Sequence, residues 1–200
     1  LGSKDTPPSS IFALFKELEK DQPKERFTLG ITDDVTFLSL PEVKPAPITA
    51  AAGTKECKFW GLGGDGTVGA NKNSVKIIGD HTDKYVQAYF QYDSKKTGGV
   101  TISHLRFGDK PIRSPYYINQ ADFVACHNPA YIHMGMKMVQ DVKPGGVFMI
   151  NCQWSDEELG QHLNAEAKKY IADNNIQLYT INAIDKAIEI GMGKRTNTIL

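Results

Sequence analysis

The sequence has few cysteines, and none of them stands in a metal-binding spacing. Cys57, Cys126 and Cys152 are the only cysteines among 200 residues, and no two form a C-x-x-C pair. Zinc sites and iron–sulfur clusters take their ligands from such closely spaced thiols. The sequence therefore predicts no metal site within this chain, and three small buried thiols in a reducing compartment.

A net charge and long apolar runs are also missing. Lys and Arg together number 23, as do Asp and Glu, so the formal net charge is zero. Such a chain has no overall field to attract nucleic acid or an anionic membrane. No apolar run approaches the roughly 20 residues that cross a bilayer, and no secretory signal opens the chain. We therefore expect no nucleic-acid partner, no membrane association and a cytoplasmic location.

The sequence is rich in glycine between residues 61 and 69, where five glycines fall within nine residues. The apolar run Phe59–Leu62 precedes them, and helical spacing of apolar residues follows over 73–78. This order predicts a strand, a tight turn and a helix. Glycines let the backbone take positive φ, and the unpaired N–H groups of a helix start point at an anion. The expected ligand is a phosphate or diphosphate.

The glycine spacing alone leaves the ligand open. The pattern G-x-G-x-x-G begins at Gly61 and again at Gly64, and both copies fit the dinucleotide-binding fingerprint. A Walker A loop requires Lys and then Ser or Thr after its last glycine, but Ala70 and Asn71 follow Gly69. Phosphoryl transfer by a P-loop is therefore disfavoured. A turn that only packs a helix on a strand rarely needs five glycines.

The remaining pattern alternates strands with helices. A first helix is expected from residue 11 to about residue 20, followed by two β-rich segments at 27–31 and 35–40 that prolines interrupt. Further strands are expected at 85–92, 100–105, 122–128, 147–151 and 176–181, with helices starting at 129, running from 155 to about 174, and over 183–190. This alternation predicts an α/β fold, a Rossmann-like three-layer domain with a largely parallel or mixed sheet.

Charged residues follow the strand expected at 85–92. In a doubly wound sheet the carboxyl end of that strand faces the same crevice as the glycine loop. Asp93 there would suit the ribose of NAD, whereas Lys95 and Lys96 would suit a ribose phosphate, as in NADP or the 3′-phosphate of coenzyme A. The residues alone leave these alternatives open.

No catalytic set is evident. His104 has no matching acid or nucleophile near it, so a packed or domain-contacting histidine explains it better than a catalytic one. Cys126, His127 and Asn128 evoke a cysteine-protease set, but neighbours on a strand point to opposite faces and cannot form a triad together.

Five motifs, in one order, resemble the gamma domain of pyruvate:ferredoxin (flavodoxin) oxidoreductases. They are the segments 63–72, 92–99, 103–108, 125–129 and 191–197. The resemblance extends from about residue 27 to residue 200. It implies that 1–54 is a connector from a preceding domain and that 55–200 is the coenzyme A binding gamma domain. The parent enzyme would decarboxylate pyruvate oxidatively to acetyl-CoA and CO2, passing electrons to ferredoxin or flavodoxin.

The resemblance also implies a division of labour. Thiamine diphosphate, Mg and 4Fe–4S clusters would lie on other domains of the parent enzyme, which is expected to be a homodimer. The chain begins with Leu1 and not with methionine, so we expect an excised piece that is inactive alone. The preferred 2-oxoacid is left open.

The residues that would bind coenzyme A fall into two groups, and no catalytic or metal-binding residue is expected. The diphosphate would be held by Gly63, Gly64, Asp65, Gly66, Thr67, Val68, Gly69 and Asn71. The phosphates of the nucleotide end would be fixed by Lys95, Thr97, Arg195 and Asn197. Two other interpretations stay open: an NAD(P)-dependent oxidoreductase, and a structural spacer between catalytic domains.

Overall fold

The computed structural model describes residues 5–93, 98–193 and 195–200. Contacts within the chain divide it into two compact units. The first unit contains residues 1–52 together with 113–117, and the second contains 53–112 and 118–200. The interpretation of 1–54 as a connector stays a prediction.

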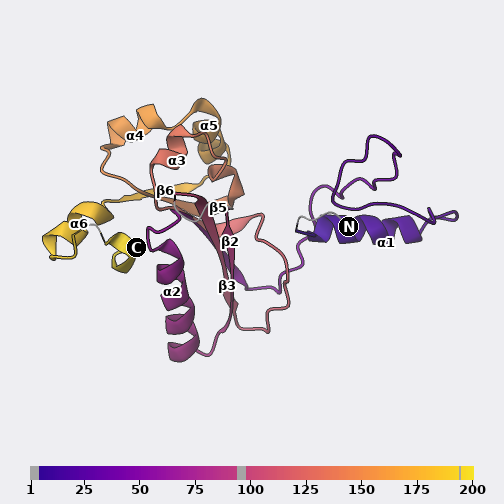
Figure 1. Cartoon of the computed structure of the whole chain (residues 1–200), viewed down its shortest axis with the longest axis horizontal. Helices are drawn as coiled ribbons and strands as arrows, with labels where there is room; N and C mark the ends of the chain where they lie inside the picture. Colours follow the sequence, from indigo (N-terminus) through magenta and orange to yellow (C-terminus); the bar gives the residue numbers. More distant parts are fainter. Residues whose placement is uncertain (1–4, 94–97, 194) are drawn as a thin grey trace. The chain divides into compact units, whose positions relative to one another are not determined.

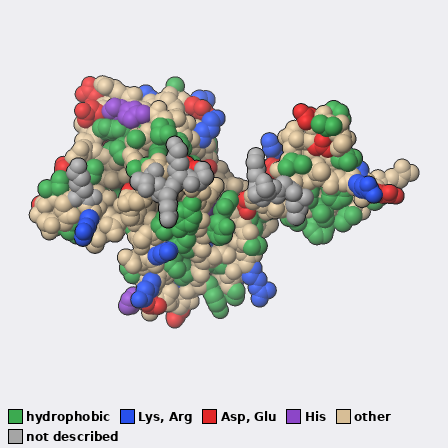
Figure 2. All heavy atoms as spheres, in the orientation of Figure 1, with side chains coloured by type: hydrophobic (Ala, Val, Ile, Leu, Met, Phe, Trp, Pro, Cys, Tyr) green, Lys and Arg blue, Asp and Glu red, His purple; other side chains and the backbone are tan. Residues whose placement is uncertain are grey.

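In the described part of the first unit there is one helix, α1 (Pro8–Leu18), with a proline at its first turn, where the missing N–H costs nothing. The β-rich segments at 27–31 and 35–40 meet only in a bridge between Thr28 and Ser39. Prolines that follow closely prevent a longer ladder. Large apolar side chains of α1 are exposed, since Phe15 and Leu18 are 58% and 57% exposed. Figure 2 shows hydrophobic side chains gathered on part of the surface of this unit.

The second unit is built on a six-stranded mixed sheet, which confirms the predicted α/β fold. The strand order is β2-β3-β1-β4-β5-β6. The bounds are β1 Lys55–Leu62, β2 Tyr85–Tyr92, β3 Val100–Gly108, β4 Ala121–Cys126, β5 Val142–Asn151 and β6 Gln177–Ile181. Strands β1, β4, β5 and β6 are parallel, whereas β3 pairs antiparallel with both β1 and β2.

Helices cover both faces of this sheet, with α2 on one side and α3, α4 and α5 on the other (Figure 1). The bounds are α2 Thr67–His81, α3 Ala130–His133, α4 Asp156–His162, α5 Ala165–Asp173 and α6 Ala183–Glu189, with 3-10 turns η1 Val139–Asp141 and η2 Thr196–Thr198. The helix expected over 155–174 is in fact two helices. Leu163 is extended, and the Asn164 side chain caps α5 by accepting the N–H of Ala167.

The two faces of the sheet differ in polarity. On the α4 and α5 side, Val124, Phe148 and Ile150 are fully buried in an apolar core with Leu159 and other helix residues. On the α2 side, the buried residues of the helix are Thr67 and Asn71. The most buried side chains of α2 are therefore polar, which is unusual for a helix packed on a sheet.

The cysteines are buried and free, as predicted. Burial raises the pKa of Cys57 and of Cys126 to about 12. No helix in the described part of the chain has the length and apolar character of a membrane-spanning segment.

Arg106 of β3 forms the most buried ion pair of the sheet and is only 2% exposed. Its Nε donates to Glu56 Oε1 at 2.9 Å, and its Nη1 donates to Gln87 Oε1 at 3.0 Å. Lys143 Nζ donates to the second oxygen of Glu56 at 3.0 Å. The pair therefore ties β3 to β1 on one side and to β2 on the other.

His104 is packed inside the sheet, in agreement with the preferred interpretation of this residue. It is 3% exposed, its Nδ1 accepts the N–H of Ile118 at 3.1 Å, and its Nε2 faces Gln91 Oε1 at 3.5 Å. Burial, with Lys58 and Arg106 nearby, lowers the pKa of His104 from 6.5 to about 3.

Candidate functional site

The candidate site lies at the carboxyl edge of the sheet, between β1 and β4. From β1 the chain passes through α2 to β2 and β3 on one side, while β4, β5 and β6 lie on the other side. Open α/β sheets bind ligands outside the carboxyl ends of their strands where the strand order reverses in this way. The glycine loop follows β1 and His127 follows β4, so these two segments flank that point.

The glycine loop is shorter than expected. Gly64 and Gly66 have φ of +95° and +92°, and Gly66 turns the chain directly into α2 at Thr67. Val68, Gly69 and Asn71, expected in the loop, therefore lie in the first turns of the helix. The sequence did not show this because the early apolar positions of α2 are too few to mark its start.

Close packing of α2 on β1 also requires a glycine at position 61. A Cβ at Gly61 would lie 2.2 Å from Thr67 Oγ1, so only glycine lets the helix start come this near to the strand.

Asp65 is committed to the loop itself. Its Oδ2 accepts the N–H of Leu62 at 2.7 Å and the hydroxyl of Thr67 at 2.9 Å, and its Oδ1 accepts the N–H of Thr67 at 2.8 Å. Within the described residues, the next two N–H groups of α2, those of Val68 and Gly69, have no acceptor. These two donors are the ones that the helix start presents to a ligand.

His127 belongs to this site, although sequence reasoning assigned it no role. It is 7% exposed, and its Nδ1 lies 2.9 Å from Thr67 Oγ1. Its backbone N–H donates to Trp60 O at 2.8 Å, and its carbonyl accepts from Asn151 Nδ2 at 3.0 Å. The available signal was its position directly after a central strand. Burial lowers the pKa of His127 from 6.5 to about 4, and the nearby Asp65 charge opposes this shift.

The fold brings Asn197 of η2 against the glycine loop. A Cβ at Gly66 would lie 2.7 Å from Asn197 Cβ, so η2 packs directly on the loop. Arg195, just before η2, is exposed and its backbone N–H donates to Met192 O at 3.3 Å. The side chain of Asn71, 3% exposed, has no partner for either polar atom in the described residues.

Lys95 and Thr97 lie outside the described residues, but the segment that follows them is placed. Gly63 N–H donates to Gly99 O at 2.7 Å, and Gly98 N–H donates to Gly63 O at 3.4 Å. The connection between β2 and β3 therefore ends beside the glycine loop.

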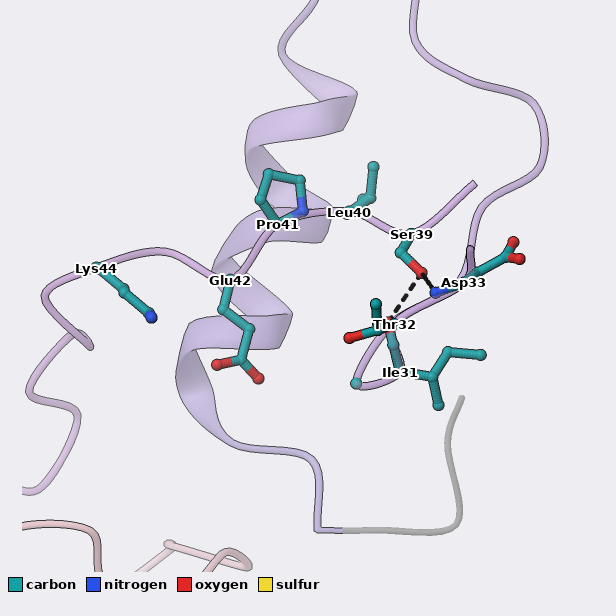
Figure 3. Close-up of a pocket in the computed structure, with 9 residues that line it drawn as sticks. Ile31, Thr32, Asp33, Ser39, Leu40, Pro41, Glu42 and Lys44 are labelled. Atoms are coloured by element: carbon teal, nitrogen blue, oxygen red, sulfur yellow. Dashed lines mark hydrogen bonds between the residues drawn. The ribbon is translucent and has the colours of Figure 1, made fainter. Parts of the chain in front are cut away.

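A separate hollow of about 650 Å³ lies in the first unit (Figure 3). Its polar groups bond to one another: Ser39 Oγ donates to Ile31 O at 2.8 Å and accepts the N–H of Asp33 at 3.0 Å. Glu42, also in its wall, accepts from Ser10 at 3.2 Å. With these groups already bonded, the hollow is a weaker candidate than the carboxyl edge of the sheet.

The two buried histidines predict a loss of stability in acid. His104 and His127 take up protons near pH 6.5 when unfolded, but only near pH 3 and pH 4 when folded. The unfolded chain thus binds more protons across this window, so stability falls as the pH falls from about 6.5 towards 4. At pH 4.5 each histidine is about 2 pH units below its unfolded pKa, and each unit is worth about 1.4 kcal/mol, so the two histidines together predict a loss of up to about 5 kcal/mol between pH 7 and pH 4.5.

Urea denaturation at fixed pH values measures this loss. A variant with asparagine at both histidine positions should show a flatter dependence over the same range. An equally steep dependence in that variant would assign the effect to other groups.

Comparison with known proteins identifies the relatives of this chain. The family model described as pyruvate ferredoxin/flavodoxin oxidoreductase matches residues 56–200. The chain is 54% identical over its whole length to a pyruvate-flavodoxin oxidoreductase of Klebsiella pneumoniae and 56% identical to a pyruvate:ferredoxin oxidoreductase of Moorella thermoacetica. It spans 17% of the length of each of these relatives.

Solved structures share the fold. A pyruvate oxidoreductase subunit from Thermotoga maritima matches with a TM-score of 0.57 and 19% identity, over 73% of this chain and 71% of that one. A 2-oxoglutarate:ferredoxin oxidoreductase from Magnetococcus marinus matches with a TM-score of 0.54 and 16% identity, over 74% of this chain and 23% of that one. With the family model covering most of the chain, the protein belongs to the pyruvate ferredoxin/flavodoxin oxidoreductase family.

Proposed function

We propose that this chain is the coenzyme A binding part of an enzyme that decarboxylates pyruvate oxidatively to acetyl-CoA and CO2 and passes the electrons to ferredoxin or flavodoxin. Family membership supports the reaction class. The Magnetococcus enzyme, which shares the fold, is described with coenzyme A and succinyl-CoA bound. Thiamine diphosphate, Mg and iron–sulfur clusters would be held by other domains of the parent enzyme, which we expect to be a homodimer.

The observation that carries the coenzyme A role is the open start of α2 at the point where the strand order reverses. The N–H groups of Val68 and Gly69 lack acceptors among the described residues and lie at the positive end of a 15-residue helix. Gly64 and Gly66 leave the approach free of Cβ atoms. A diphosphate supplies the anionic oxygens that such a site binds.

Asp65 then acts indirectly. Its carboxylate already accepts from Leu62 and Thr67, so it shapes Gly63–Gly66 and contributes no free donor to the ligand. Its negative charge lies beside the expected diphosphate and limits how tightly the loop holds that group. Thr67 and Asn71 are the buried residues of α2, and the Thr67 hydroxyl donates to the Asp65 carboxylate.

The nucleotide end of coenzyme A would be fixed by cations and amides around the loop. Asn197 already lies against Gly66, and Arg195 is two residues away on an exposed turn. Lys95 and Thr97 belong to the connection that returns to Gly63 through Gly98 and Gly99. A 3′-phosphate near these side chains would gain charge-assisted hydrogen bonds.

In this proposal the chain positions a reactant and performs no bond chemistry. Holding the diphosphate and the adenosine end leaves the pantetheine arm free to carry its thiol to an intermediate on another domain. Positioning of this kind lowers a barrier by removing the entropy cost of bringing two reactants together.

Calorimetric titration of the full-length protein with coenzyme A, 3′-dephospho-coenzyme A and NADP tests the proposal. We expect coenzyme A to bind, and the dephospho form to bind about tenfold more weakly, which corresponds to about 1.4 kcal/mol from one charge-assisted contact. A Lys95→Gln variant should bind both forms with equal affinity, because the lost contact is the one that distinguishes them.

The same titration separates the alternatives. Binding of NADP without coenzyme A would favour an NAD(P)-dependent oxidoreductase. If the full-length protein binds none of the three ligands, the result would favour a structural spacer.

A further inference from the structure

The proton on the His127 ring can be placed from its neighbours. The Thr67 hydroxyl has one hydrogen, and it donates this hydrogen to Asp65 Oδ2 at 2.9 Å, because a carboxylate only accepts. Towards His127 the same hydroxyl oxygen must therefore accept. The ring nitrogen 2.9 Å away, Nδ1, is then the donor and carries the hydrogen.

The protonation state of the second ring nitrogen follows from that of the first. In a neutral imidazole with hydrogen on Nδ1, Nε2 carries a bare lone pair and only accepts. In the described residues Nε2 of His127 is buried and has no hydrogen-bond partner. Buried polar atoms are almost always paired, and leaving one unpaired costs stability, so this acceptor calls for a donor that the described residues do not supply.

The position of His127 indicates where that donor comes from. The residue follows β4 directly and holds the first residue of α2, so it lies on the β4 side of the glycine loop, where the strand order reverses. Diphosphate oxygens accept hydrogen bonds at neutral pH and cannot satisfy a bare imidazole nitrogen. The matching group is a hydroxyl close to the diphosphate.

We propose that His127 Nε2 accepts a hydrogen bond from a ligand hydroxyl next to the diphosphate, and that His127 is therefore a ligand-positioning residue of this site. The proposal rests on the proposed coenzyme A role. Coenzyme A carries such a hydroxyl on each side of its diphosphate, on the ribose and on the pantoyl group. Gly64 and Gly66, with their positive φ, are the loop residues whose backbone can shift to admit it.

Two substitutions separate the two nitrogens. His127→Asn places an amide N–H near the position of Nδ1, so it keeps a donor to Thr67 and removes the acceptor at Nε2. His127→Gln reaches the position of Nε2 with an amide oxygen and gives up the donor to Thr67. Calorimetry on the full-length protein gives the affinity for coenzyme A, and thermal unfolding gives the stability.

We expect His127→Asn to bind coenzyme A about tenfold more weakly with little change in melting temperature, as for one lost hydrogen bond. His127→Gln should bind nearly as well as the wild type while melting earlier. His133→Asn is the matched control, since His133 is an exposed histidine of α3, and it should change neither quantity.

The ligand 3′-phospho-ADP, which lacks the pantoyl group, identifies the hydroxyl. A loss shared by both ligands in His127→Asn assigns the ribose, and a loss for coenzyme A alone assigns the pantoyl group. The reverse pattern, with His127→Gln binding weakly and His127→Asn binding normally, would show that the ring only holds Thr67 and would overturn the proposal. If His127→Asn and His127→Gln bind coenzyme A with the same affinity as each other, the proposal is overturned as well. If the wild type does not bind coenzyme A, the proposed function is overturned, and this inference is overturned with it. If the wild type binds and only the variants behave differently from expectation, the inference alone is overturned.

Discussion

Gly66→Val should weaken coenzyme A binding by about a hundredfold or more, equivalent to about 2.7 kcal/mol, while the sheet stays folded. Gly66 has a φ of +92°, which a β-branched residue adopts only with strain of about 1–3 kcal/mol. The new Cβ would also lie 2.7 Å from Asn197 Cβ and 3.0 Å from its Cγ. The loop and η2 must move apart, and the N–H groups at the start of α2 lose their alignment.

Calorimetry measures the affinity, and circular dichroism checks the fold. Gly160→Val is the matched control, because a Cβ at Gly160 in α4 meets nothing within 4 Å. Its affinity should equal that of the wild type. Normal binding by a folded Gly66→Val variant would remove the glycine loop from the site.

Arg106→Met should lower the free energy of unfolding by about 3–5 kcal/mol, since it breaks a buried pair and leaves the other charge in place. Arg106 is 2% exposed and binds Glu56 and Gln87 at once. Methionine fills much of the same volume but forms neither the hydrogen bond to Glu56 nor the one to Gln87. Among the described residues, the Glu56 carboxylate would keep its contact to Lys143.

Urea denaturation of the second unit within the full-length protein measures the change. The double variant Glu56→Gln/Arg106→Met should lose less than the sum of the two single variants, because the residues share one network. Lys137→Met removes the exposed pair with Glu166 and should change the free energy by no more than about 0.5 kcal/mol. A loss in Arg106→Met no larger than in that control would mean that the sheet does not depend on the buried pair.

The fold class could be predicted because several strands and helices of the second unit carry their own apolar pattern. Strand β2, for example, alternates its side chains, and its bounds match the expected segment at 85–92. The antiparallel insertion of β3 between β2 and β1 could not be predicted, because pairing depends on partners far away in sequence. The break between α4 and α5 was missed because the buried residues Leu159, Leu163 and Ala167 keep a helix-like four-residue spacing across it, although Leu163 and Asn164 are both extended.

The candidate site was predicted in part for a similar reason. A cluster of glycines indicates a tight backbone turn from the sequence alone, so the loop at 63–66 was predicted. His127 was missed because its role depends on Thr67, 60 positions earlier, which the fold brings within 2.9 Å. Asp65 was expected to meet the ligand, yet its three hydrogen bonds stay within 62–67. Whether Lys95, Thr97, Arg195 and Asn197 contact a nucleotide stays a prediction.

The membership of residues 113–117 in the first unit has a consequence for how the protein is made. As the ribosome releases the chain, residues 1–52 emerge first, but the backbone N–H of Tyr117 is needed for the 3.0 Å bond to Asp5 Oδ2. By then β1, β2 and β3 have also emerged, while β4, the parallel partner of β1, is still to come. Neither unit can complete before the other has begun, so the two should mature together during translation, and no single cleavage point separates one finished unit from the other.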